Sequence, residues 1–206
     1  MTTPLTLASL PLFPLHTVFY PGGLLPLRVF EARYRDMVRS CREEGKPFGV
    51  VTLLKGEEVQ QADSGLESFH PIGTLAQING VQTLSSGVEL IQCLGKERFR
   101  VTDARKLPRG LWMADVELIA PDTTVAVPQD LQQAATALRQ VLHKMPQPQW
   151  EPITASHFED CGWVANRWCE LLPMSQATQL SLLAVESPLV RLELVADALE
   201  GAGIVP

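Results

Sequence analysis

The sequence lacks the motifs that mark common nucleotide-binding and hydrolytic sites. A loop of the form G-x-x-x-x-G-K-[ST] surrounds a phosphate with backbone amides and a lysine. The pairs Gly45-Lys46 and Gly95-Lys96 have no glycine at the required upstream position, and Pro47 and Glu97 follow them. The G-x-S-x-G turn of α/β-hydrolases is also missing. We therefore expect no ATP hydrolysis, and we assign neither a catalytic residue nor a cofactor.

Basic charge and long apolar runs are also scarce. There are 17 Lys and Arg residues against 23 Asp and Glu residues, which gives a formal net charge of -6. Nucleic-acid-binding proteins are more often basic, so this balance argues against that class. The first basic residue is Arg28, which leaves no positive region for a secretory signal. No apolar run reaches the roughly 18 residues of a membrane span. We expect a cytoplasmic protein without membrane association.

The four cysteines, Cys41, Cys93, Cys161 and Cys169, form no C-x-x-C motif. In a cytoplasmic protein such cysteines are expected to be reduced. His157 and Cys161 are spaced to share one helix face, but Cys169 is rotated away from that face and a fourth ligand is missing. We therefore expect no metal site.

A β-rich lobe is predicted for residues 1–120. After a loose leader over residues 1–9, two apolar runs flank the turn Pro21-Gly22-Gly23, and a helix is expected over residues 31–44. Phe48–Leu54 is apolar enough for a buried strand. Residues 72–120 then predict a meander of short strands, which indicates a curled sheet or small barrel.

Four turns are expected within this meander. Asn79-Gly80 is typical of a hairpin, with a bulge in one long strand as the alternative. The other turns are predicted at residues 85–87, at Gly95-Lys96 and at Pro108-Arg109-Gly110.

Residues 121–206 predict a helical lobe packed on the first one. Helical periodicity appears over residues 131–142 and again after Ser156, where Ser156 and Glu159 have the spacing of a capping box. Ser175 and Ser187 have the position of N-caps for two further helices. The apolar face expected for the middle helix consists of Phe158, Cys161, Ala165, Trp168 and Leu172. The predicted fold class is α+β.

Three stretches carry a family resemblance. Residues 10–35, LPLFPLHTVFYPGGLLPLRVFEARYR, resemble the opening of the Lon protease amino-terminal domain family, and in particular its small stand-alone bacterial members. Residues 73–78 with 94–100 provide a second match, and Glu170-Leu171-Leu172-Pro173 provides a third. The resemblance implies a PUA-like pseudo-barrel followed by a helical bundle.

The resemblance also implies a role in recognition. Full-length Lon proteases carry an ATPase module and a serine-lysine peptidase module after this domain, and we expect neither here. The leading hypothesis is a non-enzymatic module that binds unfolded or apolar protein segments, or a protein partner. The alternatives are a PUA-like nucleic-acid-binding module, and a small-molecule-binding protein or enzyme that uses His16 or a carboxylate.

Five residues of the best-matched stretch are candidates for substrate binding: Phe19, Tyr20, Pro21, Arg28 and Arg33. The first three lie at a turn, where they either form an exposed apolar patch or fold back onto the barrel. The two arginines either line a peptide groove, lock the helix to the sheet through a buried ion pair, or simply face solvent. The helical period places Arg33 on the polar face of its helix.

Overall fold

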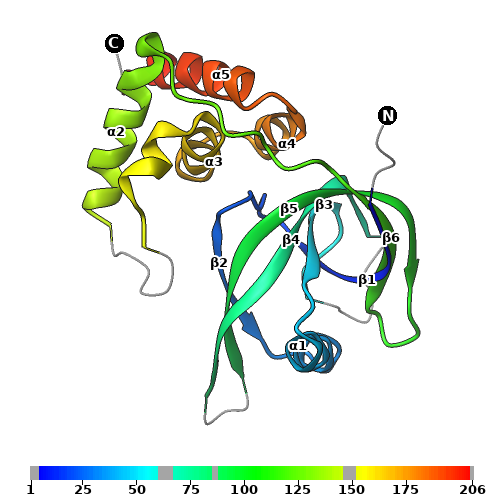
Figure 1. Ribbon diagram of the computed structural model, residues 1–206. Coiled ribbons are helices and arrows are strands. Elements are labelled where there is room, and N and C mark those ends of the chain that lie inside the picture. Colours follow the sequence, from blue (N-terminus) through cyan, green and yellow to red (C-terminus); the bar gives the residue numbers. More distant parts are fainter. Residues whose placement is uncertain (1–4, 60–66, 85–87, 146–151, 205–206) are drawn as a thin grey trace. The chain divides into compact units, whose positions relative to one another are not determined.

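The computed structural model describes residues 5–59, 67–84, 88–145 and 152–204 (Figure 1). The chain divides into two compact units, Met1–Pro121 and Asp122–Pro206, which we call unit 1 and unit 2. The described residues of unit 1 contain a six-stranded mixed sheet and one α-helix, and those of unit 2 contain four α-helices. The predicted α+β class is confirmed.

The sheet of unit 1 closes on itself. Its strands are β1 (Thr6–Leu15), β2 (Leu24–Val29), β3 (Phe48–Lys55), β4 (Ser68–Thr83), β5 (Glu89–Lys106) and β6 (Trp112–Leu118), in the order β2-β5-β4-β3-β1-β6. An additional pairing of β5 with β6 joins β1, β3, β4, β5 and β6 into a ring. Strands β1 and β3 are parallel, and the other pairs are antiparallel. This is the predicted pseudo-barrel.

Two apolar cores stabilise unit 1. The interior of the ring is filled by Leu10, Leu12, Val51, Leu75, Phe99, Ala114 and Val116. A second core lies between helix α1 (Ala32–Glu44) and the sheet, and its central contact is the stacking of Tyr34 on Phe13, with ring centroids 3.9 Å apart. Helix α1 ends at Gly45, which has left-handed backbone angles. The predicted helix over residues 31–44 is therefore confirmed within one residue.

Three predictions for the strands were wrong. Residues 6–9 belong to β1 rather than to a loose leader. Asn79-Gly80 lies inside β4, where the pairing register shifts, so the bulge is correct and the hairpin is not. Gly95-Lys96 lies inside β5 and is no turn. The predicted turn at Pro108–Gly110 is confirmed, with Gly110 at φ 85°, whereas residues 85–87 lie outside the described residues.

Helix α3 is central to unit 2. It spans Cys161–Leu171 and contacts α2 (Gln132–His143), α4 (Gln176–Ala184) and α5 (Pro188–Gly201) (Figure 1). Ser175 and Ser187 cap α4 and α5 as predicted. Ser156 does not cap α3, because this helix begins after Asp160, whose side chain accepts a hydrogen bond from Trp163 N. The predicted apolar face of the middle helix is buried throughout.

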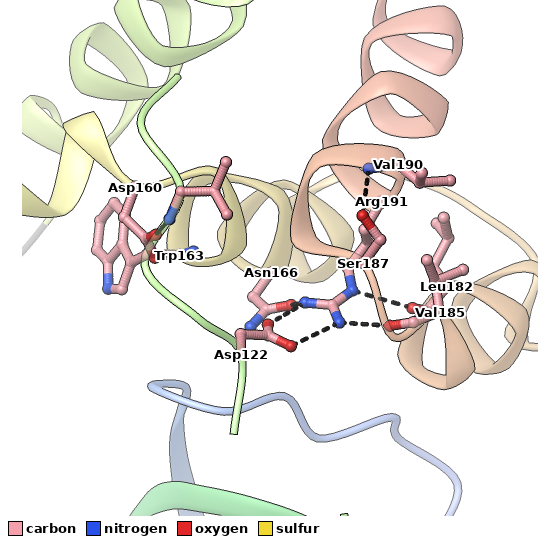
Figure 2. Close-up of polar contacts among 10 residues, drawn as sticks. Asp122, Asp160, Trp163, Asn166, Leu182, Val185, Ser187, Val190 and Arg191 are labelled. Carbon is pink, nitrogen blue, oxygen red and sulfur yellow. Dashed lines mark hydrogen bonds and ion pairs between the residues drawn. The ribbon is translucent and has the colours of Figure 1, made fainter. Parts of the chain in front are cut away.

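A buried arginine ties the segments of unit 2 together (Figure 2). Arg191 of α5 is 1% exposed and donates to both carboxylate oxygens of Asp122, at 2.5 and 3.1 Å. It also donates to Asn166 Oδ1 in α3 and to the carbonyls of Leu182 and Val185 around the end of α4. All five donors of the guanidinium are thus used, and these hydrogen bonds offset the cost of removing its charge from water.

Candidate functional site

The turn that contains Phe19, Tyr20 and Pro21 is anchored to the barrel. Phe19 belongs to the core beneath α1, Tyr20 is fully buried and Pro21 is half-buried. The Thr74 hydroxyl donates to the Phe19 carbonyl at 2.5 Å. A Cβ atom on Gly95 would overlap with the Tyr20 carbonyl. Glycine is therefore needed here so that β5 can approach the backbone of Tyr20, and not to form a turn. Of the two alternatives for this turn, Phe19 and Tyr20 therefore fit the one in which it folds back onto the barrel, and they form no exposed apolar patch.

The two candidate arginines differ in their surroundings. Arg28 is exposed on β2. Arg33 is buried, contrary to its predicted place on the polar face of α1. It pairs with Glu31 at 3.1 Å and donates to the Gly110 carbonyl at 2.7 Å. Arg33 thereby connects α1 to the turn between β5 and β6, which agrees with the locking alternative.

A groove of about 780 Å³ lies within unit 1, beside this connection. One wall is the first half of β1, over residues 7–11, which pairs with β6 but not with β3. The second wall is a face of α1, and the third is the segment around the turn between β5 and β6. None of these walls coincides with the Phe19–Pro21 turn.

The groove combines an apolar lining with charges at its rim. The apolar residues of the lining are Leu7, Ala8, Leu10, Pro11, Met37, Cys41, Pro47, Leu107, Leu111 and Met113. Leu107 is 39% exposed, and Leu111 and Met113 are half-buried, so apolar surface remains accessible. At the rim, Arg109 of the turn lies 3.9 Å from Asp36 of α1, and Lys46 lies 2.7 Å from Glu44. The rim charges are paired with one another, which favours an occupant that is held mainly by apolar contacts.

The groove offers a surface for binding rather than an activated nucleophile. Burial raises the pKa of the Cys41 thiol to about 11, with Glu44 adding to the effect, so the thiol is protonated at neutral pH. Within the described ranges, no three or more His, Cys, Asp and Glu side chains gather in a way that would hold a metal ion.

The carboxylate of Glu67 in unit 1 has a structural explanation. Glu67 accepts a hydrogen bond from Trp112 Nε1 at 2.6 Å and pairs with Lys106 at 3.0 Å. Burial raises the pKa of Glu67, but the hydrogen bonds from Trp112 and Lys106 outweigh it, so this pKa lies below its usual value. The carboxylate is therefore ionised, and it orients Trp112 near Phe69, which packs edge-on against the indole.

His16, the other residue considered as part of an enzyme site, belongs to unit 1 and is exposed. Its backbone amide donates to Glu58 at 2.6 Å. This contact fixes the loop after β1, and it provides no reason to assign a reaction to the imidazole.

Residues 9–201 match the family model of the ATP-dependent protease La (LON) substrate-binding domain. The chain belongs to this family. The match covers most of both units, which confirms the resemblance stated from the three sequence stretches.

Lon proteases are among the relatives of this Lon-domain protein. It is 30% identical to the Lon protease of Flavobacterium johnsoniae over 96 residues, which are 46% of this chain and 11% of that protease. It is 29% identical to protein cereblon of Danio rerio over 127 residues, or 58% of this chain and 28% of cereblon. The chain thus spans only a small part of the curated relatives that it matches.

Solved structures agree with the fold. A Lon N-terminal domain protein from Xanthomonas campestris is 32% identical, with a TM-score of 0.73 over 93% of this chain and 98% of that one. The N-terminal domain of a Mycobacterium avium complex Lon protease is 18% identical, with a TM-score of 0.57 over 92% and 96%, and it supports the fold alone. No helix in the described part of the Lon-domain chain has both the length and the hydrophobicity of a membrane span.

Most groove residues were missed from the sequence. Only Arg33 was a candidate, and it lies at the groove as a connector. Leu107 and Leu111 flank a predicted polar turn, and apolar residues at such a position were the available signal. Nothing local shows that this turn lies beside α1, because Arg33 and Gly110 are 77 residues apart.

Proposed function

We propose that this Lon-domain chain is a non-catalytic protein-binding module whose groove beside α1 holds an apolar segment of an unfolded polypeptide. The observation that carries the proposal is the accessible apolar lining, which is bounded by charges that are already paired. The family model, that of a substrate-binding domain, supports it. Burying one half-exposed leucine against a ligand side chain contributes roughly 1 kcal/mol, which changes the dissociation constant about fivefold.

A cytoplasmic location is part of the proposal. All four cysteines are buried thiols outside any disulfide, as is usual for proteins of a reducing compartment. Unit 1 contains 13 basic and 13 acidic residues. This balance gives no support to the nucleic-acid alternative, because phosphate binding relies on an excess of basic side chains.

Titration with reduced, carboxymethylated α-lactalbumin, which stays unfolded, tests the proposal. We expect saturable binding that Leu107→Ser and Met113→Ser each weaken roughly fivefold, because each substitution removes about 1 kcal/mol of apolar contact. Leu54→Ser is the matched control, since Leu54 is 51% exposed in the same unit and does not line the groove.

Two results would contradict this assignment. One is the absence of binding at high micromolar concentrations of the unfolded protein. The other is an equal loss of affinity with Leu54→Ser and with Leu107→Ser, which would indicate general adhesion to exposed leucines rather than a groove. Circular dichroism of each variant checks that the fold is retained.

A further inference from the structure

The charges of the two units are distributed very unevenly. Unit 2 contains 10 acidic and four basic residues, so its formal charge of -6 equals that of the whole chain, and unit 1 is neutral. Two of the four basic side chains are buried in ion pairs, Arg191 with Asp122 and Arg167 with Glu170. A third, Arg139, lies over the Phe158 ring. The surface of unit 2 is therefore strongly acidic.

The acidic residues are concentrated on the outer face of α5. Glu193, Asp197 and Glu200 are all exposed, and Glu186 is exposed just before the helix. The single basic residue of α5, Arg191, points into unit 2 toward Asp122 and Asn166 (Figure 2). The outer face of this helix thus presents acidic side chains without a basic one.

Apolar side chains lie among these acids. Val190 is 43% exposed and Leu194 is 45% exposed, one helical turn apart. The inner face of α5 is separately filled by Leu192, Val195 and Leu199, which are fully buried. Val190 and Leu194 therefore form an apolar stripe that the core of unit 2 does not use.

The acids are also poorly placed for the helix itself. Asp197 and Glu200 lie in the last turns of α5, which contain no basic residue. The carbonyl end of a helix has partial negative charge, so carboxylates there are unfavourable and cations are favourable. A cationic ligand would relieve this repulsion together with the repulsion among the carboxylates.

We propose that the outer face of α5 is a docking surface for a cationic amphipathic helix of a partner protein. Apolar residues of the partner helix, spaced three and four apart, cover Val190 and Leu194. Its Lys and Arg residues pair with Glu193, Asp197 and Glu200. Charge complementarity selects this occupant, because an acidic segment or an anionic lipid surface is repelled by the same carboxylates.

The probe that we choose is a synthetic amphipathic helix of about 18 residues with leucines on one face and lysines on the other. Its control has the same leucines with glutamates in place of the lysines. Binding to the full chain is followed by fluorescence anisotropy at two salt concentrations. We expect the lysine peptide to bind, to bind more weakly at high salt and to be preferred over the glutamate peptide.

Matched variants locate the binding surface. The triple variant Glu193→Gln, Asp197→Asn and Glu200→Gln should weaken binding roughly tenfold, as expected for three exposed charge pairs. The control is a triple variant of exposed acids in unit 1, Glu43→Gln, Glu57→Gln and Glu97→Gln, with the same change in net charge and less than about a twofold effect. Leu194→Ser should weaken binding roughly fivefold, and Leu54→Ser should not.

Three results would overturn the proposal. The first is an equal loss of affinity with the two triple variants, which would mean attraction to net charge alone. The second is equal binding of the glutamate peptide. The third is self-association of the chain in analytical ultracentrifugation that Leu194→Ser abolishes, since the occupant would then be a second copy.

Leu107→Ser separates this surface from the groove of unit 1. The lysine peptide should bind this variant normally even though the variant binds the unfolded protein more weakly. Failure of either proposal therefore leaves the other one measurable.

Discussion

The two units of this Lon-domain protein are stabilised in different ways. Unit 1 has a closed ring of strands with two apolar cores, and its formal charges cancel. Unit 2 has a buried guanidinium that joins Asp122, α3, α4 and α5, and it holds the net charge of the chain. A closed sheet pairs its backbone groups from strand to strand, whereas the short helices of unit 2 end in carbonyls that need additional donors, and Arg191 supplies two of them at Leu182 and Val185.

The largest expected effect comes from removing the central charge of unit 2. Arg191→Met should lower the free energy of unfolding by roughly 3–5 kcal/mol, because Asp122 and two carbonyls lose their donor. Hydrogen exchange measured by mass spectrometry should show a greater loss of protection in α3 and α5 than in β3 and β4. Lys144→Met, on an exposed residue of the same unit, is the control. An equal loss of protection in both units would contradict the claim that the two units are stabilised in different ways.

Unit 1 should instead be sensitive to close packing of its backbone. Gly95→Ala should cost roughly 2–3 kcal/mol, because the added methyl overlaps with the Tyr20 carbonyl. Gly80→Ala is the matched control, since its methyl would meet only Gln92 at 3.8 Å. We expect that control to change stability by less than about 0.5 kcal/mol in chemical denaturation. If the two variants lose similar amounts of unfolding free energy, the close contact with Tyr20 is not what requires glycine at position 95.

Arg33, which connects α1 to the turn at Gly110, should affect both the stability of unit 1 and the binding of unfolded protein. Arg33→Met should lower the stability of unit 1 by roughly 1–3 kcal/mol, because Glu31 and the Gly110 carbonyl lose a buried donor. It should also weaken binding of unfolded protein, because the turn that forms one wall is released. Arg28→Met, on an exposed residue, should leave stability unchanged. A loss of binding with Arg28→Met and none with Arg33→Met would instead identify Arg28 as the ligand contact.

The smallest effect depends on pH. The pKa of Glu67 is lowered in the folded state, so its stabilisation is complete above the ordinary value of 4.5 and is lost as the pH falls through the folded-state pKa. Glu67→Gln should therefore cost roughly 1 kcal/mol at neutral pH, and less as the pH falls below that ordinary value. Urea denaturation across this range measures the difference, with Glu97→Gln as the control. A cost that stays constant with pH would exclude the ionised carboxylate as its source.

Local signals predicted the elements of the fold better than their connections. The helix before Gly45 and the caps Ser175 and Ser187 depend on neighbouring residues, and they were predicted correctly. Gly95 was misread as a turn because its requirement arises from a distant segment, the carbonyl of Tyr20.

The candidate site also depends on contacts between distant segments, which the sequence did not predict. Arg33 donates to the carbonyl of Gly110 in the turn beside the groove, and no local pattern in the sequence contains that contact. Turns are usually exposed, which made Phe19 and Tyr20 candidates for binding. The hydrogen bond from Thr74 and the close approach that Gly95 allows instead keep this turn against the barrel.

Hydrogen exchange of the full chain with and without reduced, carboxymethylated α-lactalbumin tests the central claim most directly. If the groove holds the unfolded segment, the amides around Leu107–Met113 and in α1 gain protection, while those on the outer face of α5 do not. Protection confined to α5, or none anywhere at saturating ligand, would contradict the account.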